Sequence, residues 1–461
     1  MTHGFSGARA FAAAALALSA AGGCSDPLDV HIVGTVTDAT INSAAAADAL
    51  RIGALGSVNA ITAGGTGLFD RGWLDVGLFT DEYRTTGPQQ QYGELDTRNV
   101  PPTNTNLQNL YANLHRARTR AREAIDALLQ YRPSPAWGVG QMYTALALAE
   151  IELGEYFCNG VPLSGQENGQ VVYGRPMTNA EIFAVASAHL DTALTYLGAT
   201  DATTVLHNRL ARILKARVLL DIGGTGAGAA AAAQVNGVPT NYAYQLTFAL
   251  GTGDNAIWAA NTSNKSLGVG DSVDASGTLR NALPFASAGD PRVRAQGSSV
   301  GTSSQGVGAD NATPLVVQTL WGRSDPVNLA SGVDARLVEA EARLQANDFA
   351  GMTQILSALR AAPPALTPTY TPAAMPALAT PASRDAAVRL FFREKAFWTF
   401  GRGQRLGDLR RMIRQYGFTQ DQVFPTGNFF KGGTYGTQVN LDVSSAELNN
   451  PQFTACIDRN A

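Results

Sequence analysis

The residues of this chain that could do catalytic chemistry do not fall into catalytic patterns. None of the five histidines lies at metal-pair spacing, and neither His-Glu-x-x-His nor Cys-x-x-Cys occurs. The glycine-rich segments 224–228 and 268–270 lack the complete phosphate-binding pattern and its lysine, so we interpret them as loops. Asp81 and Glu82 are the most suggestive carboxylate pair, since a glycosidase needs two carboxyl groups about 5 to 9 Å apart. The sequence therefore predicts no enzyme, no cofactor and no metal, and a secreted hydrolase is the alternative.

Residues suited to binding gather in two polar stretches of the sequence, 73–99 and about 251–334. Binding pockets combine aromatic faces with a few well-placed polar groups, and sugars need both because they offer apolar C–H faces and many hydroxyls. The candidate ligand-binding residues are Trp73, Asp81, Arg84, Tyr92, Arg98, Trp258 and Trp321. Each aromatic residue has packing in the core as its alternative. We expect Asp81, Arg84, Arg98 and Trp321 to line a surface pocket, in segments that read as loops.

Apolar side chains recur at spacings of three and four residues through most of the chain, which predicts helices. We expect these helices to position the candidate residues. A capping box, Thr178 with Glu181, marks one helix start, and Gly223 ends another. The predicted helices are 106–131, 137–157, 179–197, 203–222, 228–234, 333–345, 349–361, 383–400 and 405–416. Short turns between them are typical of tetratricopeptide-type hairpins. No strict 34-residue repeat occurs, so a generic helical bundle is the alternative.

Two stretches interrupt this helical pattern. Residues 251–334 are rich in Gly, Ser, Asn and Asp with little periodicity, which predicts a long, loop-rich insertion. Long loops inside a compact chain are usually functional or disordered. The Pro- and Ala-rich piece 363–381 reads as a surface connector.

Composition is that of a globular chain with a large core. Hydrophobic residues make up 45% and charged residues 15%, and the formal net charge is -3. A mildly acidic chain without basic runs gives no electrostatic footprint for nucleic acid, which we exclude as a partner.

The N-terminus predicts export. Arg9 precedes a short apolar run from Ala10 to Gly23, which is shorter than the roughly 20 residues that span a bilayer. The run ends in Ala21-Gly22-Gly23-Cys24, which resembles a lipobox whose cysteine is acylated. We expect residues 1–23 to be a lipoprotein signal peptide and Cys24 to anchor the protein in a membrane. The alternative is an ordinary signal peptide with a chance cysteine.

Beyond Cys24 the chain has two cysteines, Cys158 and Cys456. An even pair in an exported protein suggests a disulfide. Such a bond would close a loop of roughly 300 residues, which the chain-entropy model values at about 5 kcal/mol as an upper figure. Two unpaired buried thiols are the alternative.

Near the C-terminus, a predicted helix pair carries a spaced set of residues, Glu394, Gly403, Arg405, Asp408, Leu409 and Arg411. Their order resembles the signature of the SusD/RagB family of nutrient-binding outer-membrane lipoproteins. Further matches are the Gly-Val-Pro-Leu turn at 160–163, the helix from Asn179 and Asp290-Pro291-Arg292. Trp398 and Arg402 stand where the family favours Glu, and Thr399 where it favours Leu, so the resemblance is to a divergent branch. We expect the signature residues to be structural, with Arg405 and Asp408 paired three positions apart.

The resemblance implies a mainly α fold: tetratricopeptide-like helical hairpins packed against an irregular, loop-rich lobe with a few short strands, in one domain over 24–461. It also implies a function. Such a protein, anchored in the outer membrane and facing the cell surface, captures an oligosaccharide or peptide without catalysis and passes it to a SusC-like TonB-dependent transporter. A helical-repeat scaffold lipoprotein that binds another protein is the second possibility.

Overall fold

Helices dominate the computed structural model, which describes residues 42–64, 71–167, 170–249 and 253–461. The principal helices are α2 (Ala44–Ile61), α3 (Gly72–Phe79), α4 (Gln90–Asp96), α5 (Thr105–Tyr131), α6 (Trp137–Tyr156), α7 (Asn179–Tyr196), α8 (Ala202–Ile222), α9 (Ala227–Val235), α11 (Gly332–Gln345), α12 (Phe349–Ala361), α13 (Arg384–Trp398) and α14 (Arg405–Tyr416). Short helical segments are α10 (Ala256–Trp258), η2 (Ala259–Ser263), α15 (Gln420–Val423) and η3 (Ser445–Asn449). The predicted mainly α class is confirmed, and each predicted helix is present to within two residues at either end.

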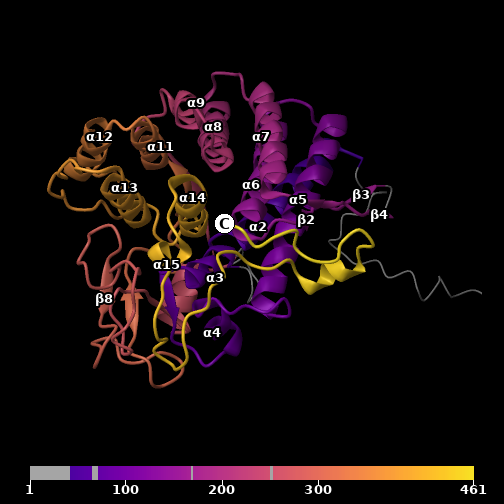
Figure 1. Ribbon diagram of the computed structural model, residues 1–461. Helices are drawn as coiled ribbons and strands as arrows, with labels where there is room; N and C mark the ends of the chain where they lie inside the picture. The colour runs from indigo at the N-terminus through magenta and orange to yellow at the C-terminus, as the bar shows by residue number, and fades with distance from the viewer. Residues whose placement is uncertain (1–41, 65–70, 168–169, 250–252) are drawn as a thin grey trace, which may run out of the picture. The chain divides into compact units, whose positions relative to one another are not determined.

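The helices pack as successive hairpins along the chain. α5 contacts α6, α6 contacts α7, and α7 contacts α8. The series continues through α9 to α11 and α12, which lie beside α13 (Figure 1). Nearly every residue of α6 is buried, because this helix has neighbours on several sides. α6 is therefore the central helix of the hairpin series.

Local signals fix the ends of several helices. The Thr178 side chain accepts from the Glu181 amide while the Glu181 side chain accepts from the Thr178 amide, so the predicted capping box is present. Asn104 caps α5 by accepting from the Leu107 amide at 3.0 Å. Gly417 follows α14 with a φ of 80°, the left-handed conformation that commonly ends a helix.

Short antiparallel strands form the rest of the ordered structure. In the described part of the chain they pair in twos: β1 (Tyr83–Thr85) with β7 (Leu267–Val269), β2 (Val161–Pro162) with β5 (Pro176–Met177), β3 (Gly165–Glu167) with β4 (Gln170–Val172), β6 (Ala243–Leu246) with β10 (Val327–Ser331), and β8 (Ala295–Gly297) with β9 (Val316–Gln318). The region predicted as a loop-rich insertion thus carries β7, β8, β9 and β10. The β1–β7 pair joins this region to the segment after α3, and together they make an irregular lobe.

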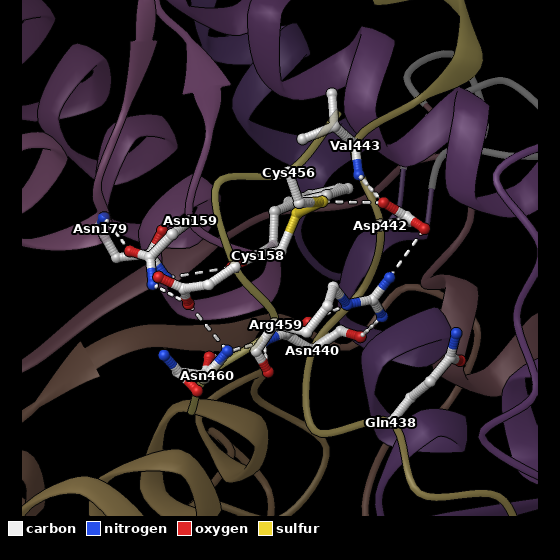
Figure 2. The surroundings of a disulfide bond; sticks show 12 residues. Cys158, Asn159, Asn179, Gln438, Asn440, Asp442, Val443, Cys456, Arg459 and Asn460 are labelled. Atoms are coloured by element: carbon white, nitrogen blue, oxygen red, sulfur yellow. Dashed lines mark hydrogen bonds and ion pairs between the residues drawn. A yellow bond between two sulfur atoms is a disulfide. The ribbon is translucent and has the colours of Figure 1, made fainter. Parts of the chain in front are cut away.

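The C-terminal tail returns to the end of α6. The Leu441 amide donates to the Tyr156 carbonyl at 2.8 Å, and the Cys158 amide donates to the Leu441 carbonyl at 2.9 Å. Cys158 and Cys456 form a disulfide at this place (Figure 2). These contacts hold the tail on the helical series.

Residues Ser43–Ala461 form one compact unit. No helix in this part of the structure has the length and apolar character needed to cross a bilayer. The predicted signal peptide and Cys24 lie outside the described residues.

Candidate ligand-binding site

The C-terminal signature residues join α14 to the segment that follows α3. Arg405 Nε and Nη2 donate to the two carboxylate oxygens of Asp81, at 2.7 and 2.9 Å. The expected pairing of Arg405 with Asp408 is wrong: Asp408 Oδ1 accepts from Lys395 Nζ at 2.5 Å and from Arg411 Nη2 at 2.9 Å. The physical reason is geometric, because a guanidinium fork binds both oxygens of one carboxylate and Asp81 offers them.

The other signature residues also make contacts within the protein. Gly403 has a φ of +66°, and an added Cβ would lie 2.1 Å from Trp73 Cδ1, so the indole of Trp73 needs glycine there. Trp73 Nε1 in turn donates to Glu152 Oε1 at 2.9 Å. Glu394 accepts from two arginine side chains, and Arg411 forms a two-bonded pair with Glu341. The contact between Arg292 and Glu394 joins the lobe to α13, whereas the pair of Arg411 with Glu341 joins α14 to α11.

The first stretch of candidate ligand residues is more ordered than predicted, because it contains α3, β1 and α4 rather than a loop. Arg84 donates to the carbonyls of Ser299 at 2.9 Å and Pro314 at 2.6 Å. Arg98 donates to the carbonyls of Gln438 and Pro425, both at 2.7 Å. Both arginines are buried, and they hold the lobe's loops through main-chain oxygens.

The remaining candidate aromatics lie in different places. Tyr92 is buried with the Arg71 guanidinium over its ring at 4.6 Å. Trp258 is half-buried and carries Arg323 at 5.8 Å, whereas Trp321 is buried.

The four residues expected to share one surface pocket are not brought together. Asp81 and Arg84 line a small crevice of about 20 Å³. Arg98 and Trp321 do not line it, and Trp321 lies in the wall of another pocket. A role in ligand binding for the seven candidates stays a prediction.

Two buried carboxyl groups beside β1 have raised pKa values. Burial raises the pKa of Glu82 to about 8, against the opposing effect of the Gly401 amide that donates to it. Burial likewise raises the pKa of Asp96 to about 7, although Asp96 Oδ2 accepts from the Thr85 amide at 2.6 Å. Asp81 and Glu82 are both buried, and both oxygens of Asp81 already accept from Arg405, so this carboxylate pair has the geometry of a structural site.

An open groove of about 500 Å³ lies on the lobe, between the two stretches that the sequence singled out. Gln89, Gln90 and Glu94 come from the start of α4, whereas Asp310 and Lys431 come from distant loops. Gln89, Gln90 and Lys431 are exposed, and the exposed Pro88 adds apolar surface, whereas Phe429 in the lining is buried. Amide, carboxylate and ammonium groups beside an apolar face are the groups that recognise a polyhydroxylated chain.

The lobe's framework holds the groove residues in place. The Asp310 amide donates to the Thr86 carbonyl at 3.0 Å, and Lys431 Nζ lies 2.7 Å from Asp310 Oδ2. Burial alone would raise the pKa of Asp310, but Lys431 and the donors of Thr313 and Ala312 outweigh it, and its pKa lies well below the usual range. Asp310 is therefore a carboxylate at neutral pH, and it can accept but not donate hydrogen bonds.

A second pocket, of about 540 Å³, lies on the helical side, among α2, α5, α6 and α8. Its aliphatic lining includes Leu148, Leu210 and Leu214, and Ile52 beside it is 58% exposed. Arg116 and Arg120 add exposed charge to the lining. This apolar character suits a protein side chain better than a sugar hydroxyl.

A third pocket, of about 150 Å³, lies near the junction of α13 and α14 and has aromatic walls. Trp321 and Trp398 line it, and both side chains are buried. Neither indole N–H finds an acceptor among the described residues. A buried donor without a partner typically costs about 1 to 3 kcal/mol, so two in one pocket need an explanation.

Metal ligation has one geometric candidate in the described part of the structure. Cys158, Asp442 and Cys456 bring their ligand atoms within 4.8 Å of one another (Figure 2). The two sulfur atoms are joined in the disulfide, and a metal would need them as thiolates. The cluster is therefore the tail's attachment point.

The nearly full-length match to solved structures identifies the architecture. A SusD superfamily protein from Bacteroides fragilis superposes with a TM-score of 0.63 at 16% identity, covering 90% of this chain and 99% of the other. The chain has the SusD fold. A SusD superfamily protein from Parabacteroides distasonis matches with a TM-score of 0.64 at 16% identity, over 91% of this chain and 99% of that one. A SusD-like carbohydrate binding protein from Bacteroides vulgatus gives a TM-score of 0.61 at 12% identity, over 89% and 97%. No family model and no curated protein matches the sequence.

The SusD fold could be predicted from the sequence, because the residues of the family signature make contacts that hold the fold together. The groove could not be predicted in this way. Gln89 and Gln90 lie within the first predicted stretch, yet the prediction chose that stretch's aromatics and arginines, which the fold buries. Lys431 comes from a tail loop whose approach to α4 has no local sequence signal. The run of three glutamines directly after Pro88, Gln89 to Gln91, was the only available cue in the sequence.

Proposed function

We propose that this protein is a SusD/RagB-type nutrient-binding lipoprotein that captures a glycan or a similar oligomer without catalysis. The observation that carries this proposal is the SusD fold over nearly the whole chain, which it shares with proteins described as carbohydrate-binding. The buried state of Asp81 and Glu82 supports a binding role over the hydrolase alternative, because the Asp81 carboxylate is already bound by Arg405.

The lobe groove is the proposed capture site. Its exposed amides can donate and accept hydrogen bonds with hydroxyl groups, and its open form suits an extended chain rather than one enclosed molecule. An anchor at Cys24 would hold the protein on the outer membrane, and handover to a TonB-dependent transporter would complete uptake.

Binding measurements on groove variants test the capture site. Wild type is screened against soluble neutral and acidic oligosaccharides and peptides, and the best ligand is titrated by calorimetry. The double variant Gln89→Ala/Gln90→Ala should raise Kd by about tenfold or more with an unchanged melting temperature. Gln354→Ala, an exposed glutamine on α12, is the matched control. Equal affinity of the groove variant and the control would exclude the groove.

Co-purification tests the partner and the anchor. The tagged full-length protein is extracted from outer membranes in mild detergent, and its partners and N-terminal acylation are identified by mass spectrometry. A stoichiometric β-barrel transporter and an acylated Cys24 are the expected results. Recovery of an unacylated protein alone would contradict both.

A scaffold role is the second candidate function, and one observation favours it. The pocket among α2, α5, α6 and α8 has an aliphatic lining and the exposed Ile52 at its side. A stoichiometric partner without a transporter, released by Ile52→Glu, would support this role.

A further inference from the structure

The pocket among α2, α5, α6 and α8 is distinct from the lobe groove, because the two share no lining residue. It measures about 540 Å³. The leucines of its floor are buried, so an occupant meets the residues of its rim. This rim combines exposed aliphatic side chains, arginines and the edge of a strand.

Two aliphatic side chains of α2 form one side of the rim. Ile52 is 58% exposed and Leu55 is half-buried, and both line the pocket. They are three residues apart, so they lie on one face of the helix. An aliphatic side chain packed on them would remove apolar surface from water, which is favourable.

The two charged residues of the lining are both arginines, and no lining residue is acidic. Arg116 and Arg120 are exposed and lie four residues apart on α5. Arg116 Nη1 donates to Asn113 Oδ1 at 2.6 Å. Arg120 Nη1 donates to Ser57 Oγ at 3.1 Å. Both of these partners are neutral, and neither guanidinium has an acidic partner among the described residues, so the rim offers two positive charges to carboxylates.

The edge of β6 forms another side of the rim. A pocket against the face of a strand contacts alternate side chains, but this pocket contacts the four consecutive residues 244–247, so it reaches the strand's edge. Within the described residues β6 pairs with β10 alone, and the main chain of 243–247 makes no other hydrogen bond. The main chain of β10 has further partners, because Arg402 donates to the carbonyls of Asn328 and Leu329 at 2.8 and 3.3 Å. An uncovered strand edge is a template for pairing with another chain.

We propose that this pocket docks an extended, acidic segment of a partner protein, which adds a strand to the edge of β6. Aliphatic side chains of the segment pack on Ile52 and Leu55, and its carboxylates bind Arg116 and Arg120. Main-chain hydrogen bonds give affinity in this mode of recognition, and side-chain contacts give specificity. A segment within a chain fits better than a free peptide, because the lining has no acidic residue to receive a terminal ammonium. The inference goes beyond glycan capture at the lobe groove, and it gives the scaffold candidate a partner of stated chemistry.

Short peptides test the site on the full chain in mild detergent, with calorimetry as the measurement. The probes are hexapeptides of alternating Val and Asp and of alternating Leu and Glu, each with capped and with free ends. Alternating Val and Lys is the charge counterpart. A capped acidic peptide should bind at least about tenfold more tightly than the lysine peptide. Added salt should weaken it, because ions screen exposed charges.

Backbone methylation tests the added strand. Two further versions of the capped Val-Asp peptide carry N-methyl groups on every Val or on every Asp. Each version loses the N–H donors along one edge and keeps its side chains, because successive residues of a strand direct their N–H groups to opposite edges. One version should lose about tenfold or more in affinity while the other binds as the unmodified peptide does. Equal binding by all three peptides would overturn the strand addition.

Protein variants locate the binding. Arg116→Gln/Arg120→Gln should weaken the acidic peptide by about tenfold or more with an unchanged melting temperature, because both side chains are exposed. Arg389→Gln/Arg393→Gln, which changes exposed arginines at the same spacing on α13, is the matched control and should bind as wild type does. Ile52→Glu brings a carboxylate against the acidic segment and should also weaken it.

The outcomes separate this inference from the proposed function. No binding of any acidic peptide at millimolar concentration, or equal binding by the arginine variant and its control, overturns the inference. Binding only by peptides with free ends would make a free peptide the occupant and overturn the partner segment. The variant Gln89→Ala/Gln90→Ala should leave the acidic peptide unchanged, and a loss there would place the peptide in the lobe groove instead. An oligosaccharide that depends on Gln89 and Gln90 supports the proposed function whatever the peptides do.

Discussion

Glu82 shows how burial turns one carboxyl group into a pH-dependent part of the fold. Its Oε1 accepts from the Gly401 amide at 2.8 Å, and its Oε2 has no partner among the described residues. Burial raises its pKa to about 8, so the folded protein holds a proton there that the unfolded chain loses near its ordinary value. Stability from this group is complete at low pH and is lost as the pH rises toward 8.

The variant Glu82→Gln should remove this dependence. Glutamine keeps the acceptor for Gly401 and stays neutral, so the variant should gain stability relative to wild type as the pH rises from 5 to 8. One pKa unit corresponds to about 1.4 kcal/mol, so the relative gain is on the order of a few kcal/mol. Thermal melts of both proteins across this range measure it, and parallel curves would contradict the raised pKa. Burial also raises the pKa values of Asp96 and Glu152 to about 7. These two groups therefore lower the stability of wild type and variant alike as the pH rises.

At the residue scale, the sequence pointed to arginines that could bind a ligand, but it did not show that the fold buries them. Arg84 and Arg98 have the guanidinium forks that bind sugars, but carbonyl oxygens 215 to 340 residues away occupy them. No local pattern encodes such distant main-chain partners. Gly403 is the opposite case. The family resemblance singled out this residue, and the structure explains why it is glycine, because a side chain there would collide with the Trp73 ring.

At the scale of elements, helices with two distinct faces were predictable and a fully buried helix was not. α5 has an apolar stripe and a polar face, so its periodicity marks it clearly. Every residue of α3 is buried, so the sequence from Gly72 to Phe79 has no polar face to show helical spacing. The segment was therefore expected to be a loop, whereas its candidate residues lie in or beside α3, β1 and α4.

The joint between α14 and the segment after α3 depends on the pair of Arg405 with Asp81. Asp81→Asn removes the charge and leaves Arg405 buried without its carboxylate, a change that typically costs about 3 to 5 kcal/mol. Chemical denaturation of the variant should show this loss, and Asp126→Asn, an exposed aspartate on α5, should show almost none. An unchanged stability together with weaker glycan binding would instead make Asp81 a ligand residue.

At the scale of the whole molecule, the disulfide connects the end of α6 to the tail across 298 residues. Cys158→Ala/Cys456→Ala should lower the free energy of unfolding by up to about 5 kcal/mol, because the unfolded chain regains the entropy of a very long loop. Denaturant titration measures the loss, and peptide mapping without reductant should recover the Cys158–Cys456 peptide from wild type. Finding both cysteines as thiols in the folded protein would contradict the pairing.

The Cys158–Cys456 disulfide can form only late in synthesis, because its two cysteines lie far apart in the sequence. The ribosome adds about 5 to 20 residues per second, so the 298 residues between the two cysteines take roughly 15 to 60 s to make. Throughout that interval Cys158 has been translated and its partner has not. Three buried hydrogen bonds form equally late, because Arg410 can donate to the carbonyls of Gly154, Glu155 and Phe157 only after α14 has been made. The end of α6 is thus translated early, but its disulfide and its hydrogen bonds to Arg410 can form only after the C-terminal part of the chain has been made.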